Sequence, residues 1–408
     1  MILEPARQTR VLGEYDVLVA GGGIAGVSAA LAAARAGASV CLLEKACALG
    51  GLATIGHVVV FLPLCDGLGH QISGGICEEL IRLSADDLSQ PDSNMGQIPI
   101  PEAWQQRKGS IEQRSKSRYR CSYNPITFAY KMERLLLKHK VKLLFDTRVV
   151  AVRREAERIA EVIIENKSGR SALSCKAVVD ASGDADICAL AGEKTVSLKS
   201  NVRCGWYYMA EGGIPKLIHL TQPFDSQGRR IPSSGRNYRG DDGDEVSKFL
   251  LDCRLMTMQD LQERERKSGL HSYPLALPLI PCFRMTRRLV GRKTLRQQDR
   301  QRWLENALGM CSDWRKVGPV YCLPLEALIG VHNANLITAG RCISSAGDTW
   351  DITRSIPVCA VTGEAAGAAA ANLALDKLPG FRELDVPALQ KYLRRKKVII
   401  DKKLLENF

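Results

Sequence analysis

Closely spaced cysteine pairs are missing from this sequence, although it contains 14 cysteines among its 408 residues. Redox dithiols and structural zinc sites usually place two cysteines in a C-x-x-C, and that spacing does not occur here. No group of His, Cys, Asp and Glu has metal-ligand spacing either, so we expect no metal site. The scattered cysteines are typical of reduced thiols, and we expect a cytoplasmic protein.

Repetition is also missing. No internal repeat of useful period is present. The pattern G-x-G-x-x-G occurs once, at residues 21–26, and is not found again. Because each dinucleotide-binding unit of this kind needs its own glycine-rich turn, the sequence does not predict a separate nicotinamide-binding domain.

Charge is missing from residues 17–34, a run almost long enough to span a membrane. Arg7 and Arg10 precede the run, so it also shares a feature with signal peptides. However, Glu14 and Asp16 lie directly before it, and three consecutive glycines interrupt it. We therefore favour a buried strand and helix over both alternatives and expect no membrane span.

Acidic residues are fewer than basic ones, 44 Asp and Glu against 57 Lys and Arg, which leaves a formal charge of +13. Part of the excess lies in residues 394–403, where basic residues alternate with apolar ones. This alternation is typical of the exposed face of a closing helix, so a nucleic acid partner is not expected. The excess suits an anionic cofactor or substrate. The length predicts two or three domains, or one domain with a long insertion.

Residues 15–44 contain the elements of a nucleotide-binding βαβ unit. An uncharged strand leads to Gly21, Gly23 and Gly26, and an Ala- and Leu-rich helix follows. The first glycine permits the tight turn, the second lets the backbone approach a pyrophosphate, and the third lets the helix pack on the strand. A second strand ends at Glu44, at the spacing of a carboxylate that accepts ribose hydroxyl groups.

The next segment, residues 44–54, has the pattern E-K-x-x-x-L-G-G-x-A-T. Together with the βαβ unit and the run LCDGLGHQ, it resembles the FAD-dependent oxidoreductases of the glutathione-reductase type, especially bacterial members with a single flavin. The resemblance implies that FAD is the cofactor and that residues 58–64 line its ring. Disulfide reductases of this type carry a redox cysteine pair just after Gly51, where this chain has only Cys65. Thiol–disulfide chemistry is therefore not expected.

Two later segments resemble the remaining flavin motifs of the same family. In residues 177–191 an apolar strand leads to A-S-G-D, which implies that Gly183 lies near the adenosine half of FAD, and Asp184 is expected to cap the following helix. Residues 335–371 contain A-G-R, then Arg354, then T-G-x-A-A-G. The resemblance implies that the helix after Arg354 points its N-terminus at the pyrimidine edge of the flavin.

The resemblance assigns FAD contacts to residues in all three parts of the chain. From the first motif these are Gly21, Gly23, Ile24, Ala25, Gly26, Glu44, Lys45, Gly50, Gly51, Ala53 and Thr54. From the middle of the chain they are Val149, Ala181, Ser182, Gly183 and Asp184. From the last motif they are Gly340, Arg341, Arg354, Ser355 and Ile356.

Six side chains are candidates for catalysis: His57, His70, Cys65, Asp66, Arg284 and Arg354. The first four lie on the segment expected beside the flavin, where a general acid or base would reach a substrate, although each also suits a packed or exposed position. Arg284, close to Arg287 and Arg288, suits bidentate recognition of a carboxylate or the exposed face of a strand. Arg354 would stabilise negative charge on the reduced flavin. Covalent attachment of FAD through His57 or Cys47 is less favoured than a non-covalent site.

Outside the motifs the patterns are weaker. Residues 86–119 are rich in Pro, Gln and charge and are expected to form a loop. Helical spacing predicts helices from Pro125, over residues 245–267 and over residues 294–308. The alternation around residues 284–288 predicts a strand.

The expected fold class is α/β, with a Rossmann-type FAD-binding domain, a parallel sheet flanked by helices, and an inserted α+β substrate domain. The FAD-binding domain is expected in three parts, at residues 1–84, 124–192 and 331–380. A loop or insertion at residues 85–123, a substrate domain at 193–330 and a helical tail at 381–408 complete the chain.

We expect an enzyme, a FAD-dependent oxidoreductase that transfers hydride between the flavin N5 and a small organic substrate. An external electron donor or acceptor is a further expected partner. One alternative is a double-bond reductase like the fumarate reductases, which such a donor would supply. Another is a flavin-dependent protein that modifies nucleic acid, which the basic charge would suit. Neither the substrate nor the oligomeric state follows from the sequence.

Overall fold

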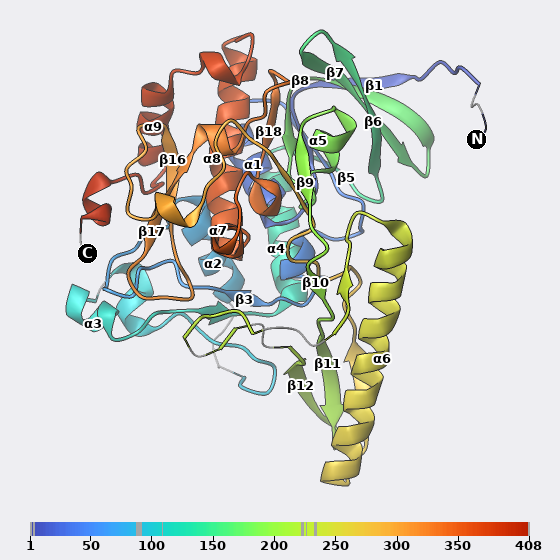
Figure 1. Ribbon diagram of the computed structural model, residues 1–408, viewed down its shortest axis with the longest axis vertical. Helices are drawn as coiled ribbons and strands as arrows, with labels where there is room; N and C mark the ends of the chain where they lie inside the picture. The colour runs from blue at the N-terminus through green and yellow to red at the C-terminus, as the bar shows by residue number, and fades with distance from the viewer. Residues whose placement is uncertain are drawn as a thin grey trace.

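The computed structural model describes residues 2, 5–86, 92–107, 109–221, 224, 225, 227–231 and 235–406. A seven-stranded sheet forms the centre of the molecule (Figure 1). In spatial order its path is β5 (Lys142–Leu144), β2 (Val40–Leu43), β1 (Val11–Ala20), β8 (Gly169–Asp180), β7 (Arg158–Asn166) and β6 (Arg148–Glu155), with β18 (Leu336–Thr338) also paired to β8. The pairs among β5, β2, β1, β8 and β18 are parallel, whereas β6, β7 and β8 pair in antiparallel fashion.

The parallel strands end at the same edge of this sheet. The Gly21 amide, just after β1, donates to the Leu43 carbonyl at the end of β2 at 2.8 Å. The Ala339 amide, just after β18, donates to the Asp180 carbonyl at the end of β8 at 3.0 Å. Segments that are far apart in the sequence are therefore side by side at this edge, which is where open α/β sheets bind their ligands.

Helices α1 (Ile24–Arg35) and α8 (Ile356–Leu375) pack against each other beside the sheet. Side chains at Gly363 and Gly367 would approach carbonyl oxygens of α1 to 2.2 and 2.1 Å, so only glycine permits this contact. By length and composition α8 is apolar enough to cross a membrane, but 83% of its most apolar window is buried within the protein. A core helix has the same properties, so α8 is weak evidence for a membrane span.

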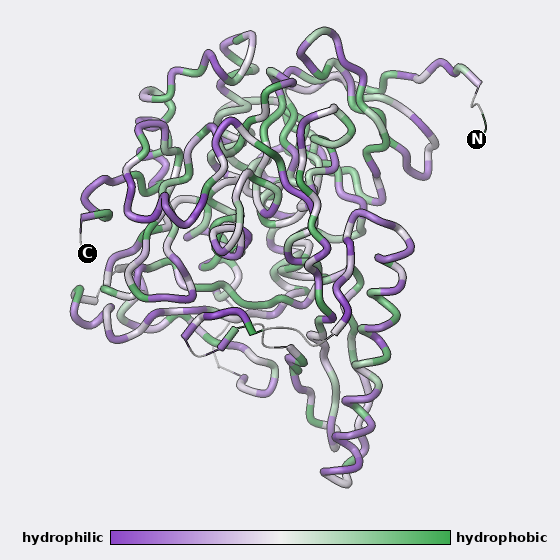
Figure 2. The backbone as a smooth tube through the Cα atoms, viewed as in Figure 1, coloured by the Kyte–Doolittle hydropathy of each residue, from purple (hydrophilic) through white to green (hydrophobic). Residues whose placement is uncertain are grey.

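An arm extends from the main body of the molecule (Figure 1). It consists of the antiparallel strands β11 (Trp206–Glu211), β12 (Ile214–His219) and β14 (Ser272–Ala276), and of helix α6 (Gly243–Ser268). The Asp242 carboxylate caps the start of α6 by accepting from the Glu245 amide at 3.0 Å, and Gly269 ends it with a φ of 69°. Figure 2 shows that the free end of the arm is mainly hydrophilic, whereas hydrophobic stretches gather in the main body.

Shorter elements complete the described chain. The helices are α2 (Ile76–Ala85), α3 (Ile111–Ser115), α4 (Pro125–Lys138), α5 (Asp186–Leu190), α7 (Asp348–Thr353) and α9 (Val386–Arg395). The strands are β3 (Val60–Phe61), β4 (Cys121–Ser122), β9 (Thr195–Ser197), β10 (Asn201–Val202), β13 (Asn237–Tyr238), β15 (Arg287–Leu289), β16 (Ala307–Ser312) and β17 (Val320–Pro324). The helices expected from Pro125 and over residues 245–267 are confirmed by α4 and α6.

The helix predicted over residues 294–308 is wrong. The structure has a single 3-10 turn there, and strand β16 already begins at Ala307. The Asp299 carboxylate accepts from the Arg296 amide and from Lys293 Nζ, both at 2.9 Å. These local bonds satisfy backbone and charge without a helix, which is how Asp competes with helical hydrogen bonding.

Two other local predictions need correction. Within the expected loop at residues 86–119, Trp104 is buried and its ring lies 5.1 Å from that of Tyr119, so this part is packed rather than open. Its helices α3 and Glu102–Arg107 are too short to show periodicity; residues 87–91 and 108 lie outside the described residues. The strand expected over residues 284–288 is restricted to β15, and the Arg284 amide instead donates to Asn201 Oδ1 at 2.8 Å.

Candidate active site

The three glycines of the first turn differ in what surrounds them. A Cβ at Gly21 would lie 2.4 Å from the Ala181 carbonyl oxygen, and one at Gly26 only 1.8 Å from the Gly21 carbonyl oxygen. A Cβ at Gly23 would meet no atom of the described chain within 4 Å. Packing therefore explains the first and third glycines, whereas Gly23 leaves backbone open toward space where a pyrophosphate fits.

Glu44 lies at the end of β2 with its side chain turned back to this glycine turn. Its Oε2 accepts from the Gly22 amide at 2.6 Å, and its Oε1 accepts from the Ala46 amide at 2.7 Å. The Gly50 amide donates to the Gly22 carbonyl at 2.8 Å, which joins the Gly50-Gly51 segment to the same turn. Each carboxylate oxygen has capacity for another donor, so Glu44 is able to accept ribose hydroxyl groups.

Arg341 connects the second and third motifs. Its Nη2 lies 2.8 Å from Asp184 Oδ1, and its Nε donates to the Gly183 carbonyl at 2.9 Å. Burial raises the pKa of Asp184, and Arg341 counteracts this. The prediction that Asp184 caps the next helix is wrong, because the Asp184 carboxylate faces Arg341. Instead the Asp186 amide, at the start of α5, donates to Ser182 Oγ at 2.9 Å.

The N-terminal end of α8 carries a buried charge cluster. Arg354, the last residue before Ser355 and α8, donates through Nη2 to Asp351 Oδ1 at 2.7 Å. Arg230 contacts both oxygens of Asp351, at 2.6 and 2.5 Å. Burial lowers the pKa of Arg354 to about 10 despite the Asp351 carboxylate, so the guanidinium keeps its charge at neutral pH. No side chain caps α8 in the described chain, so its positive end is available to an anionic group.

His57 is the buried histidine on the segment after Gly51. It is 7% exposed, has a φ of 57°, and its ring meets Tyr208 edge-on at 5.2 Å. Its ring also contacts the Trp206 backbone, and its Nδ1 has no hydrogen-bond partner among the described residues. The Trp206 contact therefore engages Nε2. Burial lowers the pKa of His57, so the ring is neutral and Nδ1 carries a free lone pair.

Arg284 lies close to the same region. Burial opposes its charge, but Cys204 and Asp351 attract it, and Arg284 in turn repels Arg354. Its Nη2 contacts Cys204 Sγ at 3.5 Å. The neighbouring Arg287 pairs with Asp186 at 2.7 Å and is therefore not available for a substrate carboxylate. The structure thus brings Arg284 and Arg354 together.

The other three candidates close a separate turn. Asp66 Oδ2 lies 2.9 Å from His70 Nδ1, and Asp66 Oδ1 accepts from the Leu68 and His70 amides at 2.7 and 3.1 Å. The Asp66 carbonyl accepts from the Gly318 amide at 2.7 Å. Cys65 is buried in the main core, and burial raises its pKa. These contacts account for all three side chains as parts of the turn.

Comparison with known families gives a match over most of the chain. The family described as FAD dependent oxidoreductase matches residues 16–200 and 245–393. The chain belongs to the FAD-dependent oxidoreductase family. It is therefore an enzyme with FAD as its cofactor. A comparison with curated proteins finds no match.

Several solved flavoprotein structures are similar at low identity. A p-nitrophenol 4-monooxygenase from Pseudomonas putida is 12% identical, with 97% of this chain and 86% of that chain covered and a TM-score of 0.46. A geranylgeranyl bacteriochlorophyll reductase-like protein from Thermoplasma acidophilum is 15% identical, with 94% and 83% covered and a TM-score of 0.43. A flavocytochrome c3 fumarate reductase is 14% identical, with 90% and 79% covered and a TM-score of 0.43. The family assignment is based on the sequence match and not on these structures.

The residues of this oxidoreductase fit FAD on three structural observations. The backbone at Gly23 is open, Glu44 has spare acceptor capacity, and the N-terminus of α1 has no side-chain cap in the described chain. Near the opposite end of the expected cofactor position, His57 Nδ1 lacks a partner among the described residues. FAD would be held by the glycine turn and Glu44 on one side, and by Gly183 and Arg341 at the adjoining strand ends.

The remaining assigned residues surround these groups. Val149 lies half-buried on β6, and exposed Lys45 is close enough to lower the pKa of Asp184 against the effect of burial. The Thr54 hydroxyl donates to the Leu49 carbonyl and holds the Gly50 turn. Asp351 was considered as a cover for the flavin, but the structure shows it as the partner of two arginines. No sequence spacing predicted that Arg230 or Cys204 would join this site, because loops from the inserted region bring them there.

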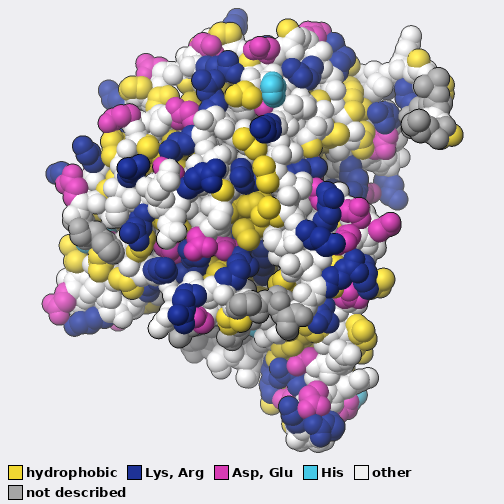
Figure 3. All heavy atoms as spheres, in the orientation of Figure 1, with side chains coloured by type: hydrophobic (Ala, Val, Ile, Leu, Met, Phe, Trp, Pro, Cys, Tyr) yellow, Lys and Arg dark blue, Asp and Glu magenta, His cyan; other side chains and the backbone are white. Residues whose placement is uncertain are grey.

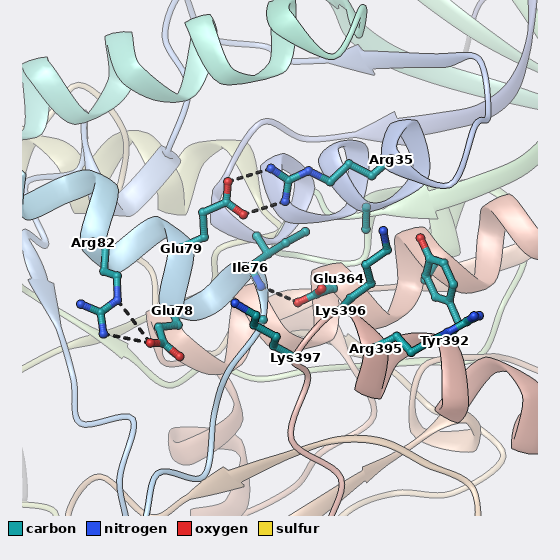
Figure 4. Close-up of a pocket in the computed structure, with 13 residues that line it drawn as sticks. Arg35, Ile76, Glu78, Glu79, Arg82, Glu364, Tyr392, Arg395, Lys396 and Lys397 are labelled. Carbon is teal, nitrogen blue, oxygen red and sulfur yellow. Dashed lines mark hydrogen bonds and ion pairs between the residues drawn. The ribbon is translucent and has the colours of Figure 1, made fainter. Parts of the chain in front are cut away.

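A separate pocket of about 840 Å³ opens between α1, α2, α8 and α9 (Figure 4). None of its lining residues belongs to the FAD motifs other than Glu364 of T-G-x-A-A-G. Glu364 is 3% exposed, and its Oε2 accepts from the Ile76 amide at the start of α2 at 2.7 Å. Burial raises the pKa of Glu364 to about 8. This pocket and the FAD motifs are thus on different parts of α8.

Proposed function

We propose that this enzyme transfers a hydride between FAD and a small organic substrate held beside residues 51–58 and the N-terminal end of α8. The observation that supports this best is His57, a buried ring whose Nδ1 has no partner among the described residues. Leaving a buried acceptor unsatisfied costs roughly 1–3 kcal/mol. A fold that keeps such an atom, on a residue with positive φ, is organised for a ligand at that position.

His57 would serve as the proton acceptor. When bound, FAD supplies the two-electron chemistry. The neutral imidazole takes a proton at Nδ1 from a substrate that is being oxidised, and returns it when a substrate is reduced. The Nε2 contact with Trp206 and the edge-on packing against Tyr208 hold the ring in place.

The charges of the site favour an anionic substrate. Arg230, Arg284 and Arg354 surround the single carboxylate of Asp351, and the cluster stays net positive even with Cys204 ionised. A substrate carboxylate would therefore be stabilised near Arg284 and Arg354. Figure 3 shows Lys and Arg side chains interleaved with Asp and Glu over one face of the molecule, without a continuous basic stripe for nucleic acid.

The experiment is an anaerobic screen of small organic acids and alcohols for loss of the visible FAD absorbance. For a compound that reduces FAD, His57→Asn should lower kcat/KM by about 10²–10⁴-fold, the usual contribution of a positioned acid–base group. His271→Asn, an exposed histidine at the end of the arm, is the matched control and should change it less than about twofold. Unchanged kcat/KM in His57→Asn would reject His57 as the proton acceptor.

The placement of the phosphate turn is tested by Gly23→Val. The added side chain meets no protein atom, so the fold should persist, but it occupies the space where the pyrophosphate binds, and FAD should be lost on gel filtration. Gly243→Val, at another open glycine position on α6, should retain full FAD. Full flavin absorbance in Gly23→Val would place the phosphates elsewhere.

A further inference from the structure

Three cysteines that are far apart in the sequence meet beside the proposed substrate site. Cys204 and Cys282 are 8% and 3% exposed, and Cys253 is partly buried next to them. The Cys204 amide donates to Cys253 Sγ at 3.4 Å. The Cys204 and Cys282 side chains hydrogen-bond to each other. A buried cluster of this kind has no counterpart in the C-x-x-C patterns that the sequence lacks.

The groups around Cys204 are arranged to stabilise its thiolate. Thr221 Oγ1 donates to Cys204 Sγ at 3.3 Å, and Arg284 Nη2 contacts the same sulfur at 3.5 Å. The hydrogen bond with Cys282 lowers the pKa of Cys204 against the effect of burial, with further contributions from Arg284 and Thr221. The pKa of Cys282 is raised, first by the same hydrogen bond and then by burial. Cys204 is therefore the nucleophilic sulfur and Cys282 the protonated one.

This pair lies against the segment that follows the Gly50-Gly51 turn. Cys282 Sγ contacts the Gly56 carbonyl oxygen at 3.2 Å, and Leu52 and Val58 pack on the same hydrophobic cluster. On the other side Arg284 is attracted to Asp351, which pairs with Arg354 at the start of α8. The pair is thus enclosed between the two segments that the proposed function places at the reactive end of FAD.

We propose that Cys204 and Cys282 form a second redox centre, a dithiol that closes to a disulfide and exchanges two electrons with FAD. When the S–S bond forms, the Cys204 thiolate and the Cys282 thiol together release two electrons and one proton. The electrons and the proton pass to oxidised FAD, and the reverse transfer breaks the S–S bond and restores thiolate and thiol. The inference rests on the proposed position of the reactive end of FAD.

Cys253 is the alternative partner for Cys204, but its contacts differ. Its sulfur accepts from the Cys204 backbone amide rather than from the Cys204 side chain. Cysteines elsewhere in the core, such as Cys311 and Cys322, have pKa values raised by burial, with no cationic side chain among the causes of the shift. The geometry therefore selects Cys282 as the partner.

The test counts electrons and thiols in the holoenzyme without any substrate. After mild oxidation with diamide and desalting, anaerobic dithionite titration should consume four electrons per chain before FAD absorbance is lost, two for FAD and two for the disulfide. Peptide mass spectrometry should show Cys204 linked to Cys282, and the free thiols should fall from 14 to two fewer. Cys282→Ser should consume only two electrons and form no such link.

Cys253→Ser is the matched control from the same cluster and should behave as the natural chain does. If Cys282→Ser is unstable, Cys282→Ala provides the same measurement. A Cys204–Cys253 link, or free thiols at Cys204 and Cys282 after diamide, would overturn the pair. A Cys204–Cys282 link with only two electrons consumed would overturn the exchange with FAD. Because neither readout uses a substrate, failure here is distinguishable from failure of the proposed hydride transfer.

Discussion

Helix α8 carries two buried ionisable centres, one at its N-terminal end and one in its middle, and they are treated differently. At the N-terminal end, Asp351 is paired with Arg354 and Arg230, and these guanidinium groups lower its pKa although burial raises it. In the middle, Glu364 has one printed-length bond of 2.7 Å, from the Ile76 amide, and burial raises its pKa to about 8. Burial is similar at both places, so the number of charged partners decides which carboxyl group stays ionised.

Figure 4 shows why the cations near Glu364 do not have the same effect. Arg35 points at Glu79, which it contacts through two nitrogens at 2.6 and 2.7 Å, and is therefore engaged by another carboxylate. Lys396 lies over the Tyr392 ring at 5.4 Å and lowers the pKa of Glu364 only as a minor influence. The comparison indicates that the FAD end of α8 is organised to hold charge, whereas its middle holds a carboxyl group that is easily protonated.

The largest expected effect comes from breaking the charged centre. Asp351→Asn leaves the buried Arg354 and its neighbour Arg230 without a carboxylate, which should lower the free energy of unfolding by about 3–5 kcal/mol. Urea unfolding of both proteins measures this. Asp348→Asn is the control, since its side chain is 61% exposed and its loss should cost less than about 0.5 kcal/mol. Equal stabilities for Asp351→Asn and the natural chain would show that the pairing does not support the fold.

The second effect concerns pH. The pKa of Glu364 is raised in the folded state, so its stabilising contribution is complete below the unfolded pKa near 4.5 and is lost as pH rises through about 8. Arg35 and Lys396 oppose this shift and Glu79 adds to it. Glu364→Gln keeps the shape of the protonated form and removes the titration.

Unfolding by urea across this pH window checks that prediction. The free energy of unfolding of the natural chain should fall more steeply with rising pH than that of Glu364→Gln, by up to about 1 kcal/mol per pH unit. Parallel curves would mean that Glu364 is ionised throughout, and the contrast with Asp351 would then disappear.

The smallest effect is on the reduction potential. Arg354 holds positive charge beside the N-terminus of α8, where it would favour reduced FAD over oxidised FAD. Arg354→Met should lower the potential by about 30 mV, equivalent to about 1.4 kcal/mol for a two-electron couple, while FAD stays bound. Equilibrium dye titration gives the value. Arg229→Met, an exposed arginine paired with Asp225, should leave it unchanged, and the same result for Arg354→Met would assign Arg354 a packing role only.

The sequence predicted the parts of the molecule in which local pattern and structure agree. The glycine turn, Glu44 at the end of β2 and the small-residue helix α8 follow from residues within short segments, each with its own backbone requirement. The helix predicted at residues 294–308 was wrong because Asp299 forms side-chain bonds to its own loop, which periodicity does not reveal. The same limit applies to Asp184, whose partner Arg341 is more than a hundred residues away.

By itself, then, the amino-acid sequence determined the βαβ unit, the family and the cofactor, because glycine turns and strand–helix alternation are local properties of the chain. Only the tertiary structure decided which candidate side chains act together. It joined His57 to Trp206 and Tyr208, Arg284 to Cys204, and Arg354 to Asp351 and Arg230, and it confined His70 and Asp66 to a turn. Such contacts depend on where loops from the inserted region return to the sheet edge, and hydrogen bonds across a hundred residues have no signature in local spacing.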